Sequence, residues 1–194
     1  MIEGKGSKDF QKTRTMMYQD PKGFERLIHR LEDHIFTFLS AQIQAGVEVV
    51  QIFDSWCSMI PHTHFEEFAI TPIQRIVKKL RQQFPLIPII GFPKSAGTKL
   101  ISYVDQVDVD AVSIDHGVDM KGIKTHSRKI LQGNLDPLCL ASDLDSTLRY
   151  ADHLIKNMSP DPFIFNLGHG IVPNTPIAHV EALINHIRSN YHAR

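Results

Sequence analysis

The chain has 194 residues, of which 42% are hydrophobic, and this is enough to bury one core in a single domain. Lysine plus arginine equals aspartate plus glutamate at 21 each, so no basic excess favours nucleic acid or an anionic membrane as a partner. No apolar run approaches the roughly 20 residues that cross a bilayer, and the first residues lack a signal-peptide core. Two cysteines, Cys57 and Cys139, make no disulfide framework, which favours a reducing cytoplasm.

The chain opens on a glycine-rich stretch, residues 1–9, that has no strand before it. A loop of this kind normally follows a strand, so the opening is typical of the middle of a larger fold. Ser7 or Asp9 is expected to cap a short helix that reaches Tyr18.

Helical periodicity follows in six later segments. Residues 21–45 carry apolar side chains at spacings of three and four, with Asp20 placed as the N-cap and Gly46 as the stop. Residues 63–83 repeat the pattern, but Pro72 is expected to break or kink that helix. The other helices are expected at 99–107, 120–127, 142–158 and 176–190.

Short apolar runs alternate with these helices, and each run ends in polar, glycine or proline residues. This pattern is typical of strands buried on both faces, joined by helical crossovers into a parallel sheet. About five such units are too few to close an eight-stranded barrel. The predicted strands are 47–53, 86–92, 111–114, 129–133 and 163–167.

The last strand runs directly into Gly168, His169 and Gly170. Glycine on each side permits a sharp turn and a close approach by another molecule. The imidazole is thereby placed at the end of a strand, where α/β proteins keep their chemistry. The alternative is a histidine that closes a tight turn by bonding to backbone, and the motif alone favours neither.

Polar residues also end the other strands. Asp54 and Asp115 each end a strand, in the position of a catalytic carboxylate or of a loop anchor, and the residues alone leave both roles open. Lys94 is favoured as a solvated loop lysine. Asn134 and Asp136 are favoured as braces of the turn that follows them.

A metal site is a further possibility, because Cys57, His62 and His64 lie close together in the sequence. Their spacing matches no closed zinc pattern, so the sequence does not favour a metal. The glycine-rich loops also lack the spacing of a phosphate-binding fingerprint.

Four motifs together resemble those of uroporphyrinogen decarboxylase, in that family's order and at fitting spacings. They are residues 2–7 (IEGKGS), 50–55 (VQIFDS), 132–137 (QGNLDP) and 166–170 (NLGHG). The resemblance covers essentially the whole chain and aligns Met1 with an internal methionine of the family. It implies an α/β fold, a partial (β/α)8 TIM barrel with strands four to eight and their helices. Residues 1–194 would then form the C-terminal portion of one barrel domain.

The resemblance also implies a reaction that needs no cofactor. The family converts the four acetate side chains of uroporphyrinogen III to methyl groups, giving coproporphyrinogen III and carbon dioxide in haem and porphyrin biosynthesis. Such chemistry needs a site that stabilises a pyrrolic cation and holds many carboxylates. A cytoplasmic homodimer with no nucleic-acid or membrane partner is implied as well. Because the family's essential aspartate lies elsewhere, the resemblance favours loop anchoring for Asp54 and Asp115.

Three residues of this chain match the family's substrate-binding positions. Phe53 matches an apolar pocket residue, Ser55 a hydroxyl that bonds a substrate carboxylate, and His169 a histidine that contacts another carboxylate. The family's catalytic aspartate, its arginines and a tyrosine correspond to positions before Met1, so no catalytic residue is expected in this chain. The alternatives are barrel core for Phe53 and a turn cap for Ser55.

Two other interpretations remain open. One is an inactive truncated or split-gene fragment, which either associates with a separate N-terminal half or is an inert remnant. The weaker alternative is a zinc-independent relative of the cobalamin-type methyltransferases. That branch uses a His-x-Cys motif, whereas His169 is followed by Gly170 and Ile171.

The sequence also makes a geometric prediction. The strand ends at Phe53, Phe92, Ile114, Gly133 and Asn166 are expected on one face of the sheet. Ser55 and His169 are expected to point into a shared cleft there. An open arc of strands exposes edges and apolar helix faces, so the chain alone is expected to be poorly soluble or self-associated, and inactive.

Overall fold

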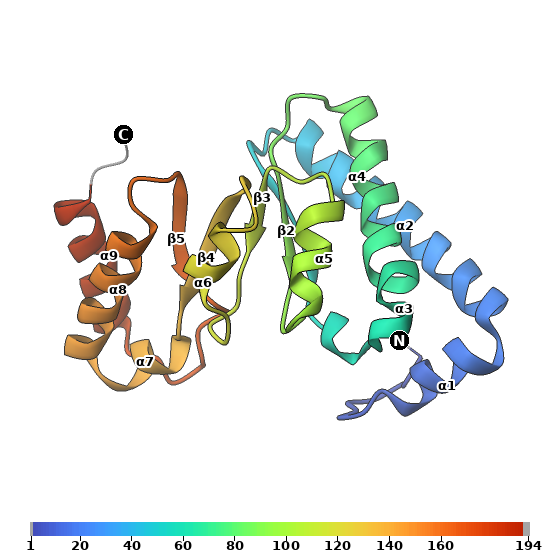
Figure 1. Ribbon diagram of the computed structural model, residues 1–194, viewed down its shortest axis with the longest axis horizontal. Coiled ribbons are helices and arrows are strands. Elements are labelled where there is room, and N and C mark those ends of the chain that lie inside the picture. Colours follow the sequence, from blue (N-terminus) through green and yellow to red (C-terminus); the bar gives the residue numbers. More distant parts are fainter. Residues whose placement is uncertain (1, 192–194) are drawn as a thin grey trace. The chain divides into compact units, whose positions relative to one another are not determined.

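The computed structural model describes residues 2–191 and divides the chain into two compact units, Met1–Asp110 and Ala111–Arg194 (Figure 1). Met1, on which the alignment with an internal methionine depends, lies outside the described residues, as do residues 192–194. Each unit is described by itself. The prediction of a single domain over residues 1–194 stays a prediction.

The first unit begins with helix α1 (Gln11–Gln19), whose start is stabilised by Glu3. One Glu3 carboxylate oxygen accepts hydrogen bonds from the Thr13 N–H at 2.8 Å and from its hydroxyl at 3.0 Å. Phe10 occupies the N-cap position at a φ of 49° and makes no side-chain cap, and Ser7 Oγ bonds the Phe10 N–H instead. The expected cap by Ser7 or Asp9 is therefore wrong, because a more distant carboxylate takes that role.

Helix α2 (Pro21–Gln44) is confirmed at both ends. The Asp20 carboxylate accepts the Gly23 N–H at 2.9 Å, and Gly46 follows the helix at a φ of 100°, where glycine is favoured. Helix α4 (Thr71–Gln83) packs against α2, and Arg75 binds the buried Glu32 carboxylate with two hydrogen bonds of 2.6 and 2.9 Å.

The segment predicted as one broken helix, 63–83, contains three pieces. Helix α3 (His62–Phe65) leads into a π-helical segment, η2 (Glu66–Ile70), and then into α4. Pro72 is the second residue of α4 and has no N–H for the preceding turn, and the wider π turn accommodates that loss. The predicted break is confirmed at this place.

Two parallel strands form the sheet of the first unit. Strands β1 (Val50–Asp54) and β2 (Ile89–Pro93) pair in register, from Val50 opposite Ile89 to Asp54 opposite Pro93. A 3-10 turn, η1 (Cys57–Met59), follows β1, and helix α5 (Lys99–Gln106) follows β2.

The second unit carries three parallel strands with their helices. Strand β4 (Ile130–Leu135) pairs with β3 (Ala111–Ser113) on one side and with β5 (Phe163–Leu167) on the other. Its helices are α6 (Met120–Lys124), α7 (Pro137–Ser142), α8 (Leu144–Met158) and α9 (Ile177–Asn190).

Helix α7 is an element that the sequence analysis did not predict. Its apolar spacing is too short for a clear period, although its start carries helix signals: Pro137 is the first residue, and Asp136 accepts the Leu138 N–H at 2.8 Å. The helix expected from residue 142 begins at Leu144, because Asp143 caps it through the Ser146 N–H.

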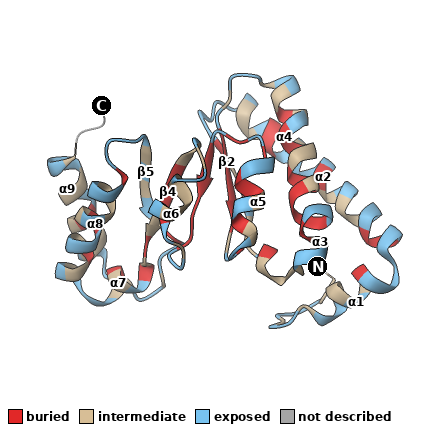
Figure 2. Ribbon diagram, viewed as in Figure 1, coloured by how far each residue is buried: buried red, intermediate tan, exposed pale blue. Residues whose placement is uncertain are grey.

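Burial differs between the strands (Figure 2). All residues of β2 and β3 are buried, whereas β5 alternates between half-buried and exposed side chains. The core of the second unit forms between β4, β5 and the helices α7 to α9, around Leu135, Leu140, Ala151 and Leu183. Several large apolar side chains remain exposed in the described residues, including Phe38 of α2 and Ile177 of α9.

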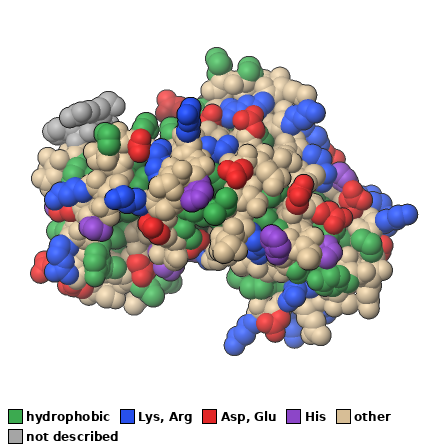
Figure 3. Space-filling model, in the orientation of Figure 1, with side chains coloured by type: hydrophobic (Ala, Val, Ile, Leu, Met, Phe, Trp, Pro, Cys, Tyr) green, Lys and Arg blue, Asp and Glu red, His purple; other side chains and the backbone are tan. Residues whose placement is uncertain are grey.

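The fold class predicted from the sequence is confirmed. Strands and helices alternate, the strands are parallel within each unit, and the five predicted strands are present within residues 2–191. This is the α/β architecture of part of a (β/α)8 barrel. Among the described residues on the face in Figure 3, basic and acidic side chains are interspersed. Within residues 2–191, no helix is long and apolar enough to cross a membrane.

Candidate functional site

The predicted strand ends line up within each unit. In the first unit Phe53 of β1 lies opposite Phe92 of β2. In the second unit the pairing is offset by one residue from the predicted ends: Gly133 of β4 lies opposite Phe165 of β5, one residue before Asn166, and Ser113, one residue before Ile114, lies opposite Gln132, one residue before Gly133. Parallel pairing places the carboxyl ends of neighbouring strands, and the loops that follow them, at the same edge. The common cleft of Ser55 and His169 stays a prediction, because they belong to different units.

Phe53 presents an apolar ring at the end of β1. Its side chain is 63% exposed, and its ring meets that of Phe92 edge to face with 5.8 Å between the ring centres. Phe92 itself is buried. The alternative of simple core is therefore wrong for Phe53 in the first unit, and its exposed face is open to an apolar ligand.

Ser55 follows β1 in a turn and is half-buried. Within residues 2–191 its hydroxyl makes no hydrogen bond, and the 3-10 turn beside it has no side-chain cap. The turn-cap alternative is therefore wrong. The hydroxyl remains available as a donor or an acceptor.

The turn that carries Ser55, residues 54–60, is held by several groups of the first unit. The Asp54 carbonyl accepts the Lys94 N–H at 3.2 Å, and Cys57 Sγ donates to the Lys94 carbonyl at 3.1 Å. Lys99 Nζ donates to the carbonyls of Cys57, Ser58 and Ile60. The sequence did not reveal Lys99, which lies about forty residues away in sequence from the carbonyls it binds.

The carboxylate of Asp54 sits within this turn. Burial raises its pKa from 3.8 to about 6, partly opposed by the N–H groups of Trp56 and Cys57 and by the charge of Lys99. Tyr103 lies nearby, and burial together with the negative charge of Asp54 raises the pKa of its phenol. The N–H groups that face the carboxylate support the predicted role of Asp54 as a loop anchor.

His169 occupies the turn after β5 and is exposed. Its imidazole makes no hydrogen bond within residues 2–191, so the alternative of a histidine that closes its own turn is wrong. Gly168 holds the turn instead: its N–H bonds the Leu135 carbonyl at 2.8 Å, and a Cβ atom at this position would overlap the backbone nitrogen of His116.

A neighbouring loop is braced by Asp115 and Asn134. The Asp115 carboxylate accepts the Gly117 N–H at 3.0 Å, as the anchoring prediction expects. Asn134 Nδ2 donates to the carbonyls of Asp115 and Val118 at 2.9 and 2.8 Å. Asn134 therefore braces the loop after β3, not the turn before Pro137.

The histidines near Cys57 have other contacts. The His64 ring stacks on Phe68 and meets Tyr18 edge to face, and Thr63 Oγ1 lies 2.9 Å from His64 Nδ1. Within residues 2–191 no three His, Cys, Asp or Glu side chains are grouped in a way that could hold a metal ion.

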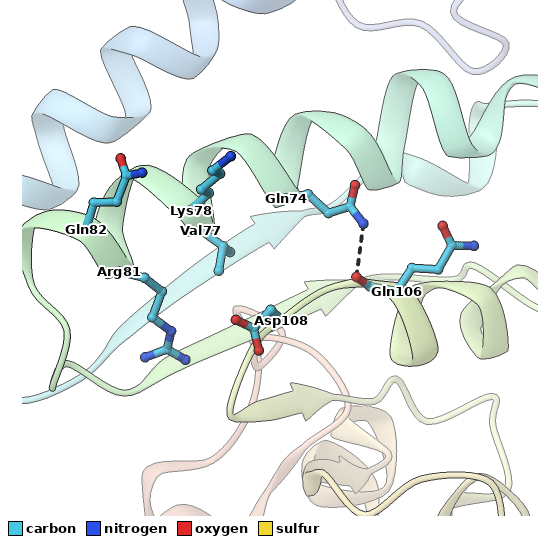
Figure 4. A pocket seen from close by; sticks show the side chains of 7 residues that line it. All are labelled: Gln74, Val77, Lys78, Arg81, Gln82, Gln106 and Asp108. Carbon is cyan, nitrogen blue, oxygen red and sulfur yellow. Dashed lines mark hydrogen bonds between the residues drawn. The ribbon is translucent and has the colours of Figure 1, made fainter.

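A separate hollow of the first unit lies between α4 and the segment that follows α5 (Figure 4). It has a volume of about 450 Å³ and is lined mainly by amide and charged side chains, with Gln74 Nε2 bonded to the Gln106 carbonyl at 3.0 Å. Arg81 is engaged with Asp110. Arg81 also donates to the Ile87 carbonyl, just before β2, so this hollow lies near the amino-terminal end of β2, whereas Phe53 and Ser55 follow the carboxyl end of β1.

The fold and the strand-end residues define a parallel α/β protein of the barrel type. Comparison with known proteins identifies the family to which it belongs. The family described as Uroporphyrinogen decarboxylase (URO-D) matches residues 1–190. The chain belongs to this family. A uroporphyrinogen decarboxylase of Granulibacter bethesdensis is 42% identical over 97% of this chain, and one of Sphingopyxis alaskensis is 43% identical over the same share.

The chain spans 56% of the length of each of these two relatives. Among solved structures, a methyltransferase from Methanosarcina mazei matches 94% of this chain and 54% of its own, with a TM-score of 0.80 and 17% identity. At that identity the likeness shows the fold alone.

Proposed function

We propose that this chain supplies the carboxyl-terminal half of a uroporphyrinogen decarboxylase site, which removes carbon dioxide from the four acetate side chains of uroporphyrinogen III to give coproporphyrinogen III. The observation that carries the proposal is the family match over residues 1–190, a range that includes Phe53, Ser55 and His169, the three residues proposed to bind substrate. No cofactor is part of the proposal.

The substrate is a polyanionic macrocycle, and the chain offers matching chemistry at its strand ends. The Ser55 hydroxyl donates to one carboxylate, and an imidazole N–H of His169 donates to another. The exposed ring of Phe53 packs on the apolar face of a pyrrole. All three act by binding and orientation.

Decarboxylation leaves an electron pair that a protonated pyrrole ring accepts. Stabilising that cation requires a nearby anion, and we assign this role to the aspartate that the family carries in its amino-terminal half. Neither Ser55 nor His169 is proposed as the proton donor. The 194-residue chain is therefore proposed to be inactive alone.

The test is to assay the chain by itself and after co-expression with the amino-terminal segment of the Granulibacter bethesdensis relative that it does not span. The assembly of the two segments is the completed enzyme. Carbon dioxide release and coproporphyrinogen formation are measured for the chain alone and for the completed enzyme. We expect no turnover by the chain alone and measurable turnover by the completed enzyme. An active monomeric chain would contradict the proposal.

Variants of the completed enzyme test the individual roles. His169→Ala is expected to raise KM while the protein stays folded. Ser55→Ala is expected to have a milder effect, because a neutral hydrogen bond contributes about 0.5–1.5 kcal/mol. Complete loss of turnover in Ser55→Ala with unchanged substrate binding would show a chemical role that this proposal does not assign.

We propose a homodimer in the cytoplasm for the completed enzyme, and self-association for the chain alone. Exposed apolar side chains such as Phe38 and Ile177, together with strand β5, which alternates between half-buried and exposed side chains, support the self-association. Cys57 and Cys139 are both free thiols, which suits a reducing compartment. Light scattering on both preparations measures the association state, and a monodisperse monomeric chain would contradict this part of the proposal.

A further inference from the structure

The placement of Lys99 is unusual for a lysine. It is the first residue of α5, where the positive end of the helix dipole disfavours a cation. Its ammonium instead reaches the 3-10 turn η1 and the residue that follows it, where the carbonyl oxygens at the end of the turn favour a cation. A lysine at the start of α5 is therefore electrostatically unfavourable for that helix, and its contacts with the carbonyl oxygens of the turn offset this unfavourable interaction.

These contacts converge on one segment. Lys99 Nζ lies 2.7 Å from the Ile60 carbonyl oxygen, 3.2 Å from that of Ser58 and 3.5 Å from that of Cys57. The same ammonium lies 4.9 Å from the centre of the Phe65 ring, in the range of a cation–π contact. With its donors directed at three carbonyls, the ammonium acts on this turn and not on a ligand.

The other side of the turn is fixed as well. The Asp54 carboxylate faces the N–H groups of Trp56 and Cys57, and the Trp56 ring packs on Phe10 with 4.9 Å between the ring centres. Ser55 lies between these supports, and its hydroxyl has no partner of its own within residues 2–191. Its position is therefore set by the backbone of the turn.

We propose that Lys99 is a positioning residue for Ser55: its ammonium gathers the three carbonyls of the turn and holds the serine hydroxyl where it meets a substrate carboxylate. This inference rests on the proposed substrate contact of Ser55. Lys99 acts through the turn, so its loss acts on substrate binding far more than on the chemical step.

The first experiment needs no ligand and uses the 194-residue chain. Hydrogen exchange is measured for the Met59 and Ile60 amides, which bond the Trp56 and Cys57 carbonyls. Lys99→Met is expected to speed their exchange about tenfold or more. Lys99→Arg keeps the charge and is expected to restore most of the protection, while Lys78→Met changes an exposed lysine of α4 as the matched control. Unchanged protection in Lys99→Met would overturn the inference.

The second experiment is a double-mutant cycle on the completed enzyme. Lys99→Met and Ser55→Ala are each expected to raise KM roughly three- to tenfold, with kcat within about twofold. The double variant is expected to be no worse than Ser55→Ala alone, because Lys99 acts through Ser55. The inference would be overturned if the increases in KM of the two single variants multiplied in the double variant. It would also be overturned if Lys99→Met lowered kcat and left KM unchanged.

The two proposals fail in different ways. If Ser55→Ala keeps the KM of the unchanged enzyme, the substrate contact of Ser55 is wrong, and the exchange measurement alone then decides whether Lys99 holds the turn. If Ser55→Ala raises KM but Lys99→Met leaves both KM and exchange unchanged, the substrate contact stands and the positioning role falls.

Discussion

The turns that carry Ser55 and His169 are fixed by different physical means. The Ser55 turn is held by charged and polar side chains, chiefly Asp54 and Lys99. The His169 turn is held by the backbone of Gly168, which bonds the Leu135 carbonyl and packs where no side chain fits. One turn depends on electrostatics and the other on close packing.

This difference determines how each turn responds to change. Electrostatic anchors are graded, since they respond to pH and to the charge of one side chain. Close packing is all or none, because one added methyl group must displace backbone. In both turns the residue proposed to bind substrate makes no hydrogen bond within residues 2–191, so support and binding are assigned to different residues.

The largest expected effect is that of Gly168→Ala. A Cβ atom there would overlap the backbone nitrogen of His116, which cannot move as freely as the end of a side chain. We expect a loss of about 3 kcal/mol in the free energy of unfolding. Urea unfolding followed by circular dichroism measures it.

Gly170→Ala is the matched control, because a Cβ atom at that glycine of the same turn meets nothing within 4 Å. It is expected to change the free energy of unfolding by less than about 0.5 kcal/mol. Equal losses in the two variants would show that packing at Gly168 does not hold this turn.

A smaller effect is expected from pH acting on Asp54. The folded state raises its pKa from 3.8 to about 6, so the folded protein binds this proton more tightly than the unfolded chain does. The stabilisation is full below about pH 4 and is lost as pH rises through about 6. We expect a loss of roughly 1–2 kcal/mol across that window from this group.

Asp54→Asn isolates this contribution, because its amide oxygen still accepts an N–H while the group no longer titrates. Its unfolding free energy is expected to fall less than that of the unchanged chain between about pH 4 and about pH 7. Asp143 and Asp152 have lowered pKa values, so their contributions disappear only as the solution becomes more acidic. Identical slopes in this window for the two proteins would contradict the assignment to Asp54.

The sequence predicted the parts of this architecture that local pattern determines. The structure confirms three such features: the strands, the helix cap by Asp20 and the break near Pro72. Each depends on neighbours within a few residues. The cap of α1 by Glu3 and the contacts of Lys99 could not be read in that way. They join segments ten and about forty residues apart, and periodicity carries no information about such pairs.

The sequence likewise predicted the residues of the candidate site but not the contacts that support them. Strand ends locate Phe53, Ser55 and His169 because chemistry gathers where parallel strands end. Their matched roles came from the family resemblance, and the structure adds that Phe53 is exposed. The supports of each turn depend on tertiary contacts that only the folded chain displays.

The smallest expected effect is on stability when the two proposed binding residues are removed. Ser55→Ala deletes a hydroxyl and His169→Ala an exposed ring, and neither side chain makes a hydrogen bond within residues 2–191. Each variant is expected to change the free energy of unfolding by less than about 0.5 kcal/mol. Any larger effect on KM in the completed enzyme then belongs to substrate binding and not to folding. A destabilisation as large as that of Gly168→Ala in either variant would mean that support and binding are not separate in that turn.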